Sequence, residues 1–226
     1  MPDNRDDGQR TRVFTRRAFI KGAGAAAAIT SFIGGPTPPS AGVTRAQSSP
    51  TPASGAAERL GPDAATIVLT VNGKSRKIAV EPRVTLAEAL RDHLGLHGTK
   101  LVCDRGACGA CTVHLDGNPV VACMMLAADA RGHEIVTIEG LGAPDRMHPV
   151  QSAFVEADAL QCGFCTPGMV MSVAALLSRN PAPDMGEVKR AVAGNICRCG
   201  TYPHVFKAAL AAAAKMRGVK PPGERA

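Results

Sequence analysis

The chain has 226 residues, of which 45% are hydrophobic and 20% are charged, with 26 Lys and Arg against 19 Asp and Glu. This length suits one large domain or two small ones, and the composition excludes a wholly disordered polyelectrolyte. No apolar run approaches the roughly 20 residues of a membrane-spanning helix. The net charge of +7 and the eight cysteines leave nucleic-acid binding, disulfides, metal sites and redox chemistry open.

The first part of the chain is laid out like an export signal. The adjacent pair Arg16 and Arg17 precedes Phe19 and Lys21, a short Gly- and Ala-rich stretch follows, and cleavage is expected near Thr44-Arg45-Ala46. This arrangement is typical of a twin-arginine signal peptide. We therefore predict a twin-arginine signal peptide over 1–46, a Pro/Ala/Ser-rich linker over 47–62, export by the twin-arginine machinery and a periplasmic location.

The basic charge lies mainly in this leader. Residues 1–46 contain seven of the Lys and Arg and three of the acids, so removing them leaves 19 against 16 and a net charge of +3. The chain also has one Tyr and no Trp, and therefore lacks the aromatic platform on which nucleotides stack. We expect no nucleic-acid partner and no transmembrane segment.

Residues 63–141 are predicted to form a small β-rich domain. Two β-branched runs on either side of Asn72-Gly73 indicate a hairpin, because this dipeptide tolerates positive φ at both positions. The Thr85-x-x-Glu88 capping box predicts a helix that Gly95 ends. The expected elements are the strands Thr66–Val71, Lys74–Val80, Thr112–Leu115, Pro119–Ala122 and Glu134–Ile138, and the helix Leu86–His93.

Four cysteines of this domain follow the pattern C-x4-C-x2-C with a distant fourth. They are Cys103, Cys108, Cys111 and Cys123. This is the spacing of plant-type ferredoxins, in which four thiolates hold a 2Fe-2S cluster. The Gly and Ala residues between them allow the backbone to wrap closely around a cluster.

Residues 142–226 are predicted to form a helical domain, in which Thr166 serves as an N-cap and Asp184-x-x-Glu187 precedes the third helix. The expected helices are Val150–Ala159, Pro167–Ser178, Glu187–Ala193 and Pro203–Met216. The remaining cysteines, Cys162, Cys165, Cys197 and Cys199, precede the second and fourth helices. Two positive helix N-termini suit an anionic tetrathiolate site.

Several other interpretations are open at the level of residues. The second cysteine set could hold zinc, and eight cysteines in an exported chain could form disulfides. Against disulfides, twin-arginine export moves folded proteins, and a C-x-C loop is poor disulfide geometry. The six histidines show no metal-site spacing, and we expect them on the surface.

With its cysteines divided into two sets of four, the chain resembles the small iron-sulfur subunit of the xanthine oxidase family of molybdenum hydroxylases. The export signal makes it most similar to the periplasmic aldehyde oxidoreductases of that family. One departure is Val102, where the family commonly has glycine. The stretches that carry the resemblance are Gly98–Lys100, Cys103–Val113, Glu139–Leu141, Gln161–Met169 and Gly194–Tyr202.

The resemblance implies an α+β fold with a β-grasp, ferredoxin-like domain followed by a four-helix domain. Each domain would hold a 2Fe-2S cluster, and Gln161 and Cys199 would touch a molybdopterin cofactor, often the cytosine dinucleotide, on a large partner subunit. That subunit would oxidise an aldehyde with oxygen from water, so no catalytic residue is expected in this chain. Electrons would leave one at a time to an FAD-binding subunit or a cytochrome.

Two alternatives to the aldehyde oxidoreductase follow from the same residues. The first is the small subunit of an N-heterocycle hydroxylase of the isoquinoline or nicotinate type, which shares the Cys-Arg-Cys-Gly-Thr-Tyr form. The second is a stand-alone ferredoxin-like electron carrier, which would need only the first cluster domain.

Overall fold

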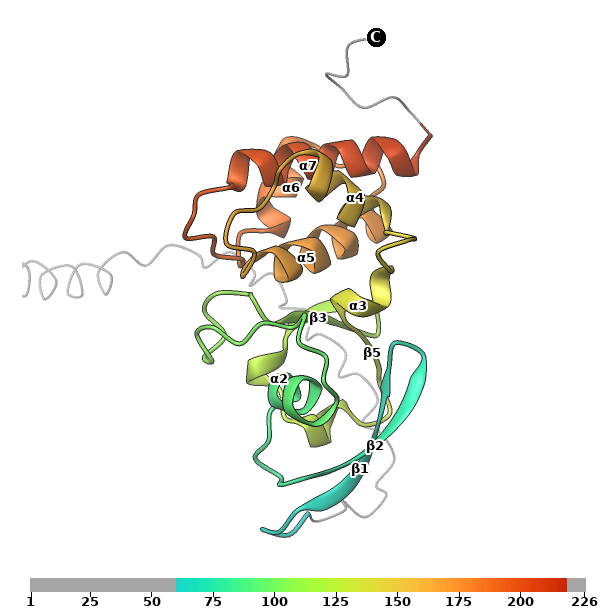
Figure 1. Ribbon diagram of the computed structural model, residues 1–226, viewed down its shortest axis with the longest axis vertical. Coiled ribbons are helices and arrows are strands. Elements are labelled where there is room, and N and C mark those ends of the chain that lie inside the picture. The colour runs from blue at the N-terminus through green and yellow to red at the C-terminus, as the bar shows by residue number, and fades with distance from the viewer. Residues whose placement is uncertain (1–59, 219–226) are drawn as a thin grey trace, which may run out of the picture. The chain divides into compact units, whose positions relative to one another are not determined.

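The computed structural model describes residues 60–218, so the predicted signal peptide and almost all of the predicted linker lie outside the described residues. A five-stranded sheet comes first in the described chain, and a group of helices follows it (Figure 1). The predicted α+β class is confirmed. Over 60–218, no helix has the length and apolar character needed to cross a membrane.

The sheet has the strand order β2-β1-β5-β3-β4, in which β1 and β5 are parallel and the other pairs are antiparallel. The predicted hairpin is confirmed, with positive φ at both Asn72 and Gly73. Ile67 and Leu69 of the first strand are buried, whereas Val68 between them is exposed, as a sheet with one covered face requires. The strands are β1 (Ala65–Val71), β2 (Lys74–Val80), β3 (Thr112–Leu115), β4 (Asn118–Val121) and β5 (Glu134–Val136).

One helical segment covers the buried face of the sheet. Helix α2 (Leu86–Glu88) begins with the predicted capping box at Thr85 and continues as a π-helix over Ala89–His93. The predicted helix over Leu86–His93 is confirmed, and its second half is π-helical because the Leu94 N–H reaches back five residues to the Ala89 carbonyl. Leu86 and Leu90 are fully buried and pack into the core of the sheet domain.

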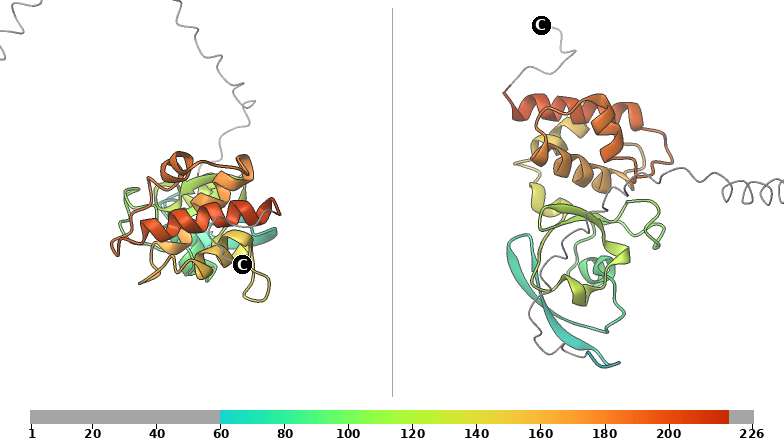
Figure 2. Two further views of the ribbon diagram at one scale, coloured as in Figure 1. Left: turned by 90° about the horizontal axis from the view of Figure 1, so that it is seen from above. Right: turned by 180° about the vertical axis from the view of Figure 1, so that it is seen from behind.

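The helical domain contains the four expected helices with shifted ends. They are α4 (Pro149–Glu156), α5 (Thr166–Arg179), α6 (Met185–Ala191) and α7 (Tyr202–Met216). Thr166 is the first residue of α5 and Cys165 is the N-cap, so Thr166 as N-cap was wrong. Helix α6 starts at Met185 because the Asp184 carboxylate caps the Glu187 N–H. Figures 1 and 2 show α5 nearer the sheet than α7, which lies on the outer side.

The last strand ends earlier than expected, and a short helix, α3 (Ile138–Leu141), follows it. The cause is Asn72, whose side chain accepts a hydrogen bond from the Thr137 N–H at 2.9 Å and donates one to the Thr137 hydroxyl at 3.0 Å. That hydroxyl donates to Glu139, whose other oxygen accepts the Gly98 N–H at 2.7 Å. The hairpin turn is thereby tied to the loop that leads to the first cysteines.

Helix α5 packs on β3 and β4, which brings the two domains into contact. His114 of β3 is buried there, and its Nε2 donates to the Met171 carbonyl at 2.8 Å. Burial lowers the pKa of His114. The expectation of surface histidines was wrong for this residue, because the face of β3 that carries it is covered by α5.

The contact between the domains is close at Gly168 in α5. A Cβ added at Gly168 would collide with the Gly109 carbonyl oxygen and lie 3.1 Å from the Asn195 amide nitrogen. A Cβ added at Gly194, in the same region, would meet nothing within 4 Å.

We therefore expect Gly168→Ala to lower the free energy of unfolding by about 1–3 kcal/mol, the usual cost of overpacking. Gly194→Ala is the matched control and should change the free energy of unfolding by much less. Thermal unfolding followed by circular dichroism would measure both. Equal stability of the two variants would contradict the close contact at Gly168.

Candidate metal centres

The first cysteine set is assembled by the loop before β3 and by the pairing of β3 with β4. Cys103 and Cys108 are half-buried in the loop, and Cys111 directly precedes β3. Cys123 lies in a 3-10 turn after β4, and strand pairing places its N–H 3.5 Å from the Cys111 sulfur. Sequence positions separated by 12 residues are therefore adjacent in space.

The backbone of this loop turns toward the cysteines. Gly106 and Gly109 have φ of 71° and 67°, which side chains other than glycine adopt only with strain. The turn directs the Gly106 N–H to the Cys123 sulfur at 3.3 Å. A main-chain N–H aimed at sulfur is the interaction expected around an anionic iron-sulfur cluster.

The second set lies at the start of two helices. Cys165 is the N-cap of α5, and Cys162 precedes it on the surface. Cys197 is buried and Cys199 is half-buried in the loop before α7. The Cys165 and Cys197 thiols lie close enough for each to shift the pKa of the other. Positions 32 residues apart in the sequence thus converge, as the predicted set of four requires.

The pKa values of the thiols differ within each set. The pKa of Cys103 is lowered to about 7, mainly by a hydrogen bond from the Arg105 backbone and to a lesser extent by one from the Cys108 thiol. Burial raises the pKa of Cys111 to about 12. Burial likewise raises the pKa of Cys165 to about 12. Burial also acts to raise the pKa of Cys197, but hydrogen bonds outweigh it and lower this pKa to about 7. The largest of these lowering effects comes from the Thr201 hydroxyl. Metal binding would have to displace protons from the two high-pKa thiols.

The grouping of the side chains fits a two-iron cluster. All eight cysteines are free thiols. Among residues 60–218, no three His, Cys, Asp or Glu side chains gather around one point as the ligands of a single ion do. Cys111 interacts with both Cys123 and Cys108, and Cys165 with both Cys197 and Cys162. The Thr166 hydroxyl, beside Cys165, is buried without a partner. A buried donor next to a ligand fits a bound group that accepts hydrogen bonds, as cluster sulfur does.

The two sets are joined through a buried polar junction. The Asn195 side chain donates to the Gly109 carbonyl at 2.9 Å and accepts from the Ser172 hydroxyl at 2.7 Å. The next N–H, from Ile196, donates to the Cys108 carbonyl at 2.9 Å. A single hydrogen bond therefore connects a cysteine of the first set with the neighbour of Cys197 in the second.

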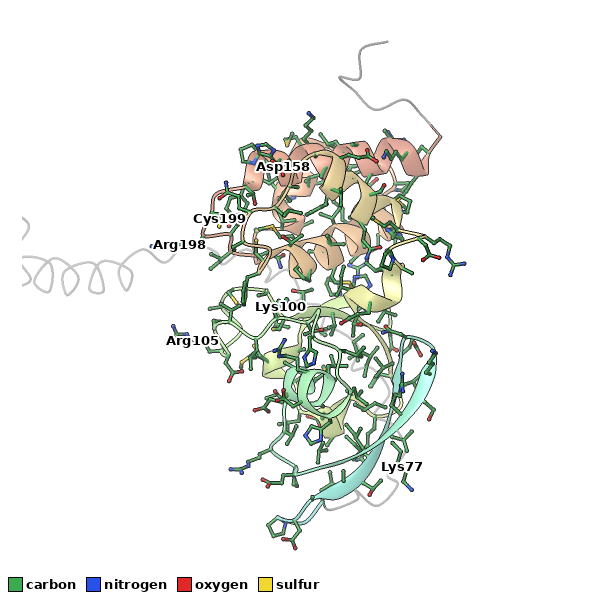
Figure 3. The ribbon with its side chains drawn as sticks, in the orientation of Figure 1. Lys77, Lys100, Arg105, Asp158, Arg198 and Cys199 are labelled. Carbon is green, nitrogen blue, oxygen red and sulfur yellow. The ribbon has the colours of Figure 1, made fainter. Side chains whose placement is uncertain are left out.

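The residues predicted to contact a pterin lie near the surface. Gln161 is exposed beside exposed Cys162, and Cys199 is half-buried. Figure 3 shows Arg105 and Arg198, one from each cysteine loop, pointing outward on the same side as Cys199. Val102 is 57% exposed, so the departure from glycine does not crowd the loop. The ligand and pterin roles stay predictions.

Sequence reasoning assigned no role to three residues that shape the second site. Asn195 forms the junction, the Tyr202 hydroxyl bridges the Cys197 N–H and the Asn195 carbonyl, and the Thr201 hydroxyl contacts the Cys197 sulfur. All three belong to the stretch Gly194–Tyr202 that carried the family resemblance. That stretch was a signal for their importance. Thr201 and Tyr202 find their partners within it, whereas Asn195 bonds Gly109 and Ser172 in other parts of the chain.

Two domain families match the chain over the regions just described. Residues 69–134 match a family described as a 2Fe-2S iron-sulfur cluster binding domain. Residues 137–210 match a family described as a 2Fe-2S binding domain. Together they include all eight cysteines.

Similar proteins are subunits of oxidoreductases. The aldehyde oxidoreductase iron-sulfur-binding subunit of Escherichia coli is 42% identical over 69% of this chain and 75% of its own length. The nicotinate dehydrogenase small FeS subunit of Eubacterium barkeri is 44% identical over 63% of this chain and 91% of its own length.

Solved structures agree in sequence and in fold. A chain of quinoline 2-oxidoreductase from Pseudomonas putida is 44% identical with a TM-score of 0.65, over 69% of this chain and 98% of that one. The aldehyde oxidoreductase of Desulfovibrio desulfuricans is also 44% identical, with a TM-score of 0.66, over 68% of this chain and 17% of that longer chain.

Reciprocal substitutions test the two ligand sets. Cys108→Ser should remove or alter the electron paramagnetic resonance signal of the first cluster and leave the other signal in place. Cys162→Ser should do the reverse, so each variant is the control for the other. Loss of both signals in either variant would contradict two separate sets, and two zinc ions in a colourless protein would contradict iron-sulfur clusters altogether.

Proposed function

The chain belongs to the iron-sulfur subunits of the xanthine oxidase family of molybdenum hydroxylases, and we propose that it transfers electrons within an exported aldehyde oxidoreductase. The observation that carries this proposal is the pair of cysteine sets joined by the Ile196–Cys108 hydrogen bond. The arginine pair of the predicted leader supports the export, and the similarity to aldehyde oxidoreductases supports the aldehyde.

The reaction takes place on the partner subunit. An aldehyde and water give a carboxylic acid, two protons and two electrons, and molybdopterin on the large subunit would accept that electron pair. The 2Fe-2S clusters supply one-electron sites. The cysteines of this chain would bind the irons of the clusters. The fold buries Cys111, Cys123, Cys165 and Cys197 away from water and keeps the two sets adjacent.

Electrons would enter at the second set and leave from the first. Gln161 and Cys199 would contact the pterin, which places the second set nearest the large subunit. Three large apolar side chains flank this set in exposed positions, namely Leu160, Phe164 and Ile196. Exposed apolar side chains grouped beside a site are typical of a protein interface, and we assign this one to the large subunit.

The acceptor after the first set is an FAD-binding subunit in this proposal, and a cytochrome is the alternative. Cys103 and Cys108 are only half-buried, so the first set is close enough to the surface to pass electrons outward. The large subunit would carry molybdopterin as the cytosine dinucleotide.

An N-heterocycle hydroxylase is the second candidate. The similarity to the nicotinate dehydrogenase subunit and to quinoline 2-oxidoreductase, both 44% identical, favours it. Substrate is selected in the large subunit, so the residues of this chain do not distinguish the two. A stand-alone electron carrier is disfavoured, because such a carrier needs only the first cluster domain. It would not require the helical domain or the junction between that domain and the sheet.

Substrate tests on the intact complex distinguish these candidates. We expect the purified complex to oxidise benzaldehyde and to leave isoquinoline and nicotinate unreacted, with an artificial electron acceptor followed by absorbance. Oxidation of an N-heterocycle with no aldehyde turnover would replace the aldehyde proposal by the second candidate. Isolation of this chain without a molybdenum subunit would favour the carrier.

Export depends on the arginine pair in this proposal. Arg16→Lys with Arg17→Lys should retain the loaded complex in the cytoplasm, because the twin-arginine machinery reads the two guanidinium groups. Arg10→Lys with Arg12→Lys preserves the same charge outside the pair and is the matched control. Cell fractionation and immunoblotting measure both, and full periplasmic recovery of the first variant would end the export proposal.

A further inference from the structure

Thr201 occupies an N-cap position but does not act as one. Threonine at this position normally accepts a hydrogen bond from the second or third N–H of the helix. In α7 no such side-chain bond forms. The Thr201 hydroxyl instead lies 3.1 Å from the Cys197 sulfur.

The direction of this hydrogen bond follows from the chemistry of a ligand cysteine. A cysteine bound to iron is a thiolate and has no proton to donate. The hydroxyl must then be the donor. Thr201 is 4% exposed and Cys197 is 8% exposed, so water does not compete for the sulfur and the interaction is stronger than it would be at the surface.

We propose that the Thr201 hydroxyl raises the reduction potential of the second cluster by donating a hydrogen bond to Cys197. The proposal rests on the function proposed above, in which the second set holds a 2Fe-2S cluster. One-electron reduction adds a negative charge that is shared with the ligand sulfurs. A donor fixed at Cys197 stabilises the reduced state more than the oxidised state.

The first set lacks this type of donor within the described residues. Its sulfurs accept from main-chain groups, the N–H of Gly106 at 3.3 Å and the N–H of Cys123 at 3.5 Å. Thr112, next to Cys111, directs its hydroxyl to the Gly109 carbonyl at 2.7 Å. The hydroxyl-to-sulfur bond therefore belongs to the second cluster, which receives electrons first.

Redox titration of the intact complex tests this role. In Thr201→Val, which is nearly isosteric and removes no helix cap, we expect the second cluster to become harder to reduce by about tenfold. This corresponds to about 59 mV for a one-electron couple. Thr201→Ser keeps the hydroxyl and should restore the wild-type potential. Electron paramagnetic resonance during the titration distinguishes the two clusters.

The matched control is Thr99→Val, which removes a buried hydroxyl that has no hydrogen-bond partner and lies four residues before Cys103 of the other set. It should leave the potential of the second cluster unchanged. An unchanged potential in Thr201→Val, with the second signal intact, would overturn the proposal. A shift in Thr201→Ser as large as that in Thr201→Val would also overturn it, because the methyl group would then be the cause.

Iron analysis separates this inference from the function on which it rests. Wild-type complex with fewer than two clusters per chain would refute the proposed function, whereas a full complement with no shift would refute only the role of Thr201. If Thr201→Val does not load the second cluster, Thr201→Ala gives the same comparison without added bulk. Failure of both variants to load, with loading in Thr201→Ser, would assign the hydroxyl to assembly and overturn a role in the potential.

Discussion

The buried amide of Asn195 is the interaction on which the arrangement of both sites depends. A side chain that is 3% exposed must satisfy its hydrogen bonds internally, and Asn195 does so by bonding Gly109 in one domain and Ser172 in the other. This fixes the position of the following residue, whose N–H reaches the Cys108 carbonyl. The absence of a side chain at Gly168 permits the close approach. The domains are therefore joined at the cysteine loops themselves.

In the proposed function this junction would hold two one-electron sites next to each other, and the groups around the sulfurs would control the charge there. Each set combines a thiol whose pKa is lowered to about 7 with one whose pKa burial raises to about 12. Main-chain N–H groups face the first set, and the Thr201 hydroxyl faces the second. The two sites thus differ in their donors although their ligands are the same.

Features that depend on neighbours in the sequence were predicted well. The hairpin at Asn72-Gly73, the capping box at Thr85 and the four helices of the second domain follow from local backbone and side-chain preferences, and the structure contains all of them. Apart from the N-cap of α5, which is one residue earlier than predicted, the errors lie where a distant residue intervenes. The last strand is shortened because Asn72 binds Thr137, 65 residues away, and His114 is buried because α5 covers β3.

The sequence by itself determined the number and type of the candidate ligands, because C-x4-C-x2-C and the C-x2-C and C-x-C pairs are local spacings that a short loop presents in only a few ways. Only the tertiary structure decided how these loops meet. The bond between Asn195 and Gly109 spans 86 residues, and no local preference specifies it. The same holds for the Gly106 N–H, which reaches the Cys123 sulfur across 17 residues, whereas Thr201 and Cys197 are four residues apart and meet within one loop.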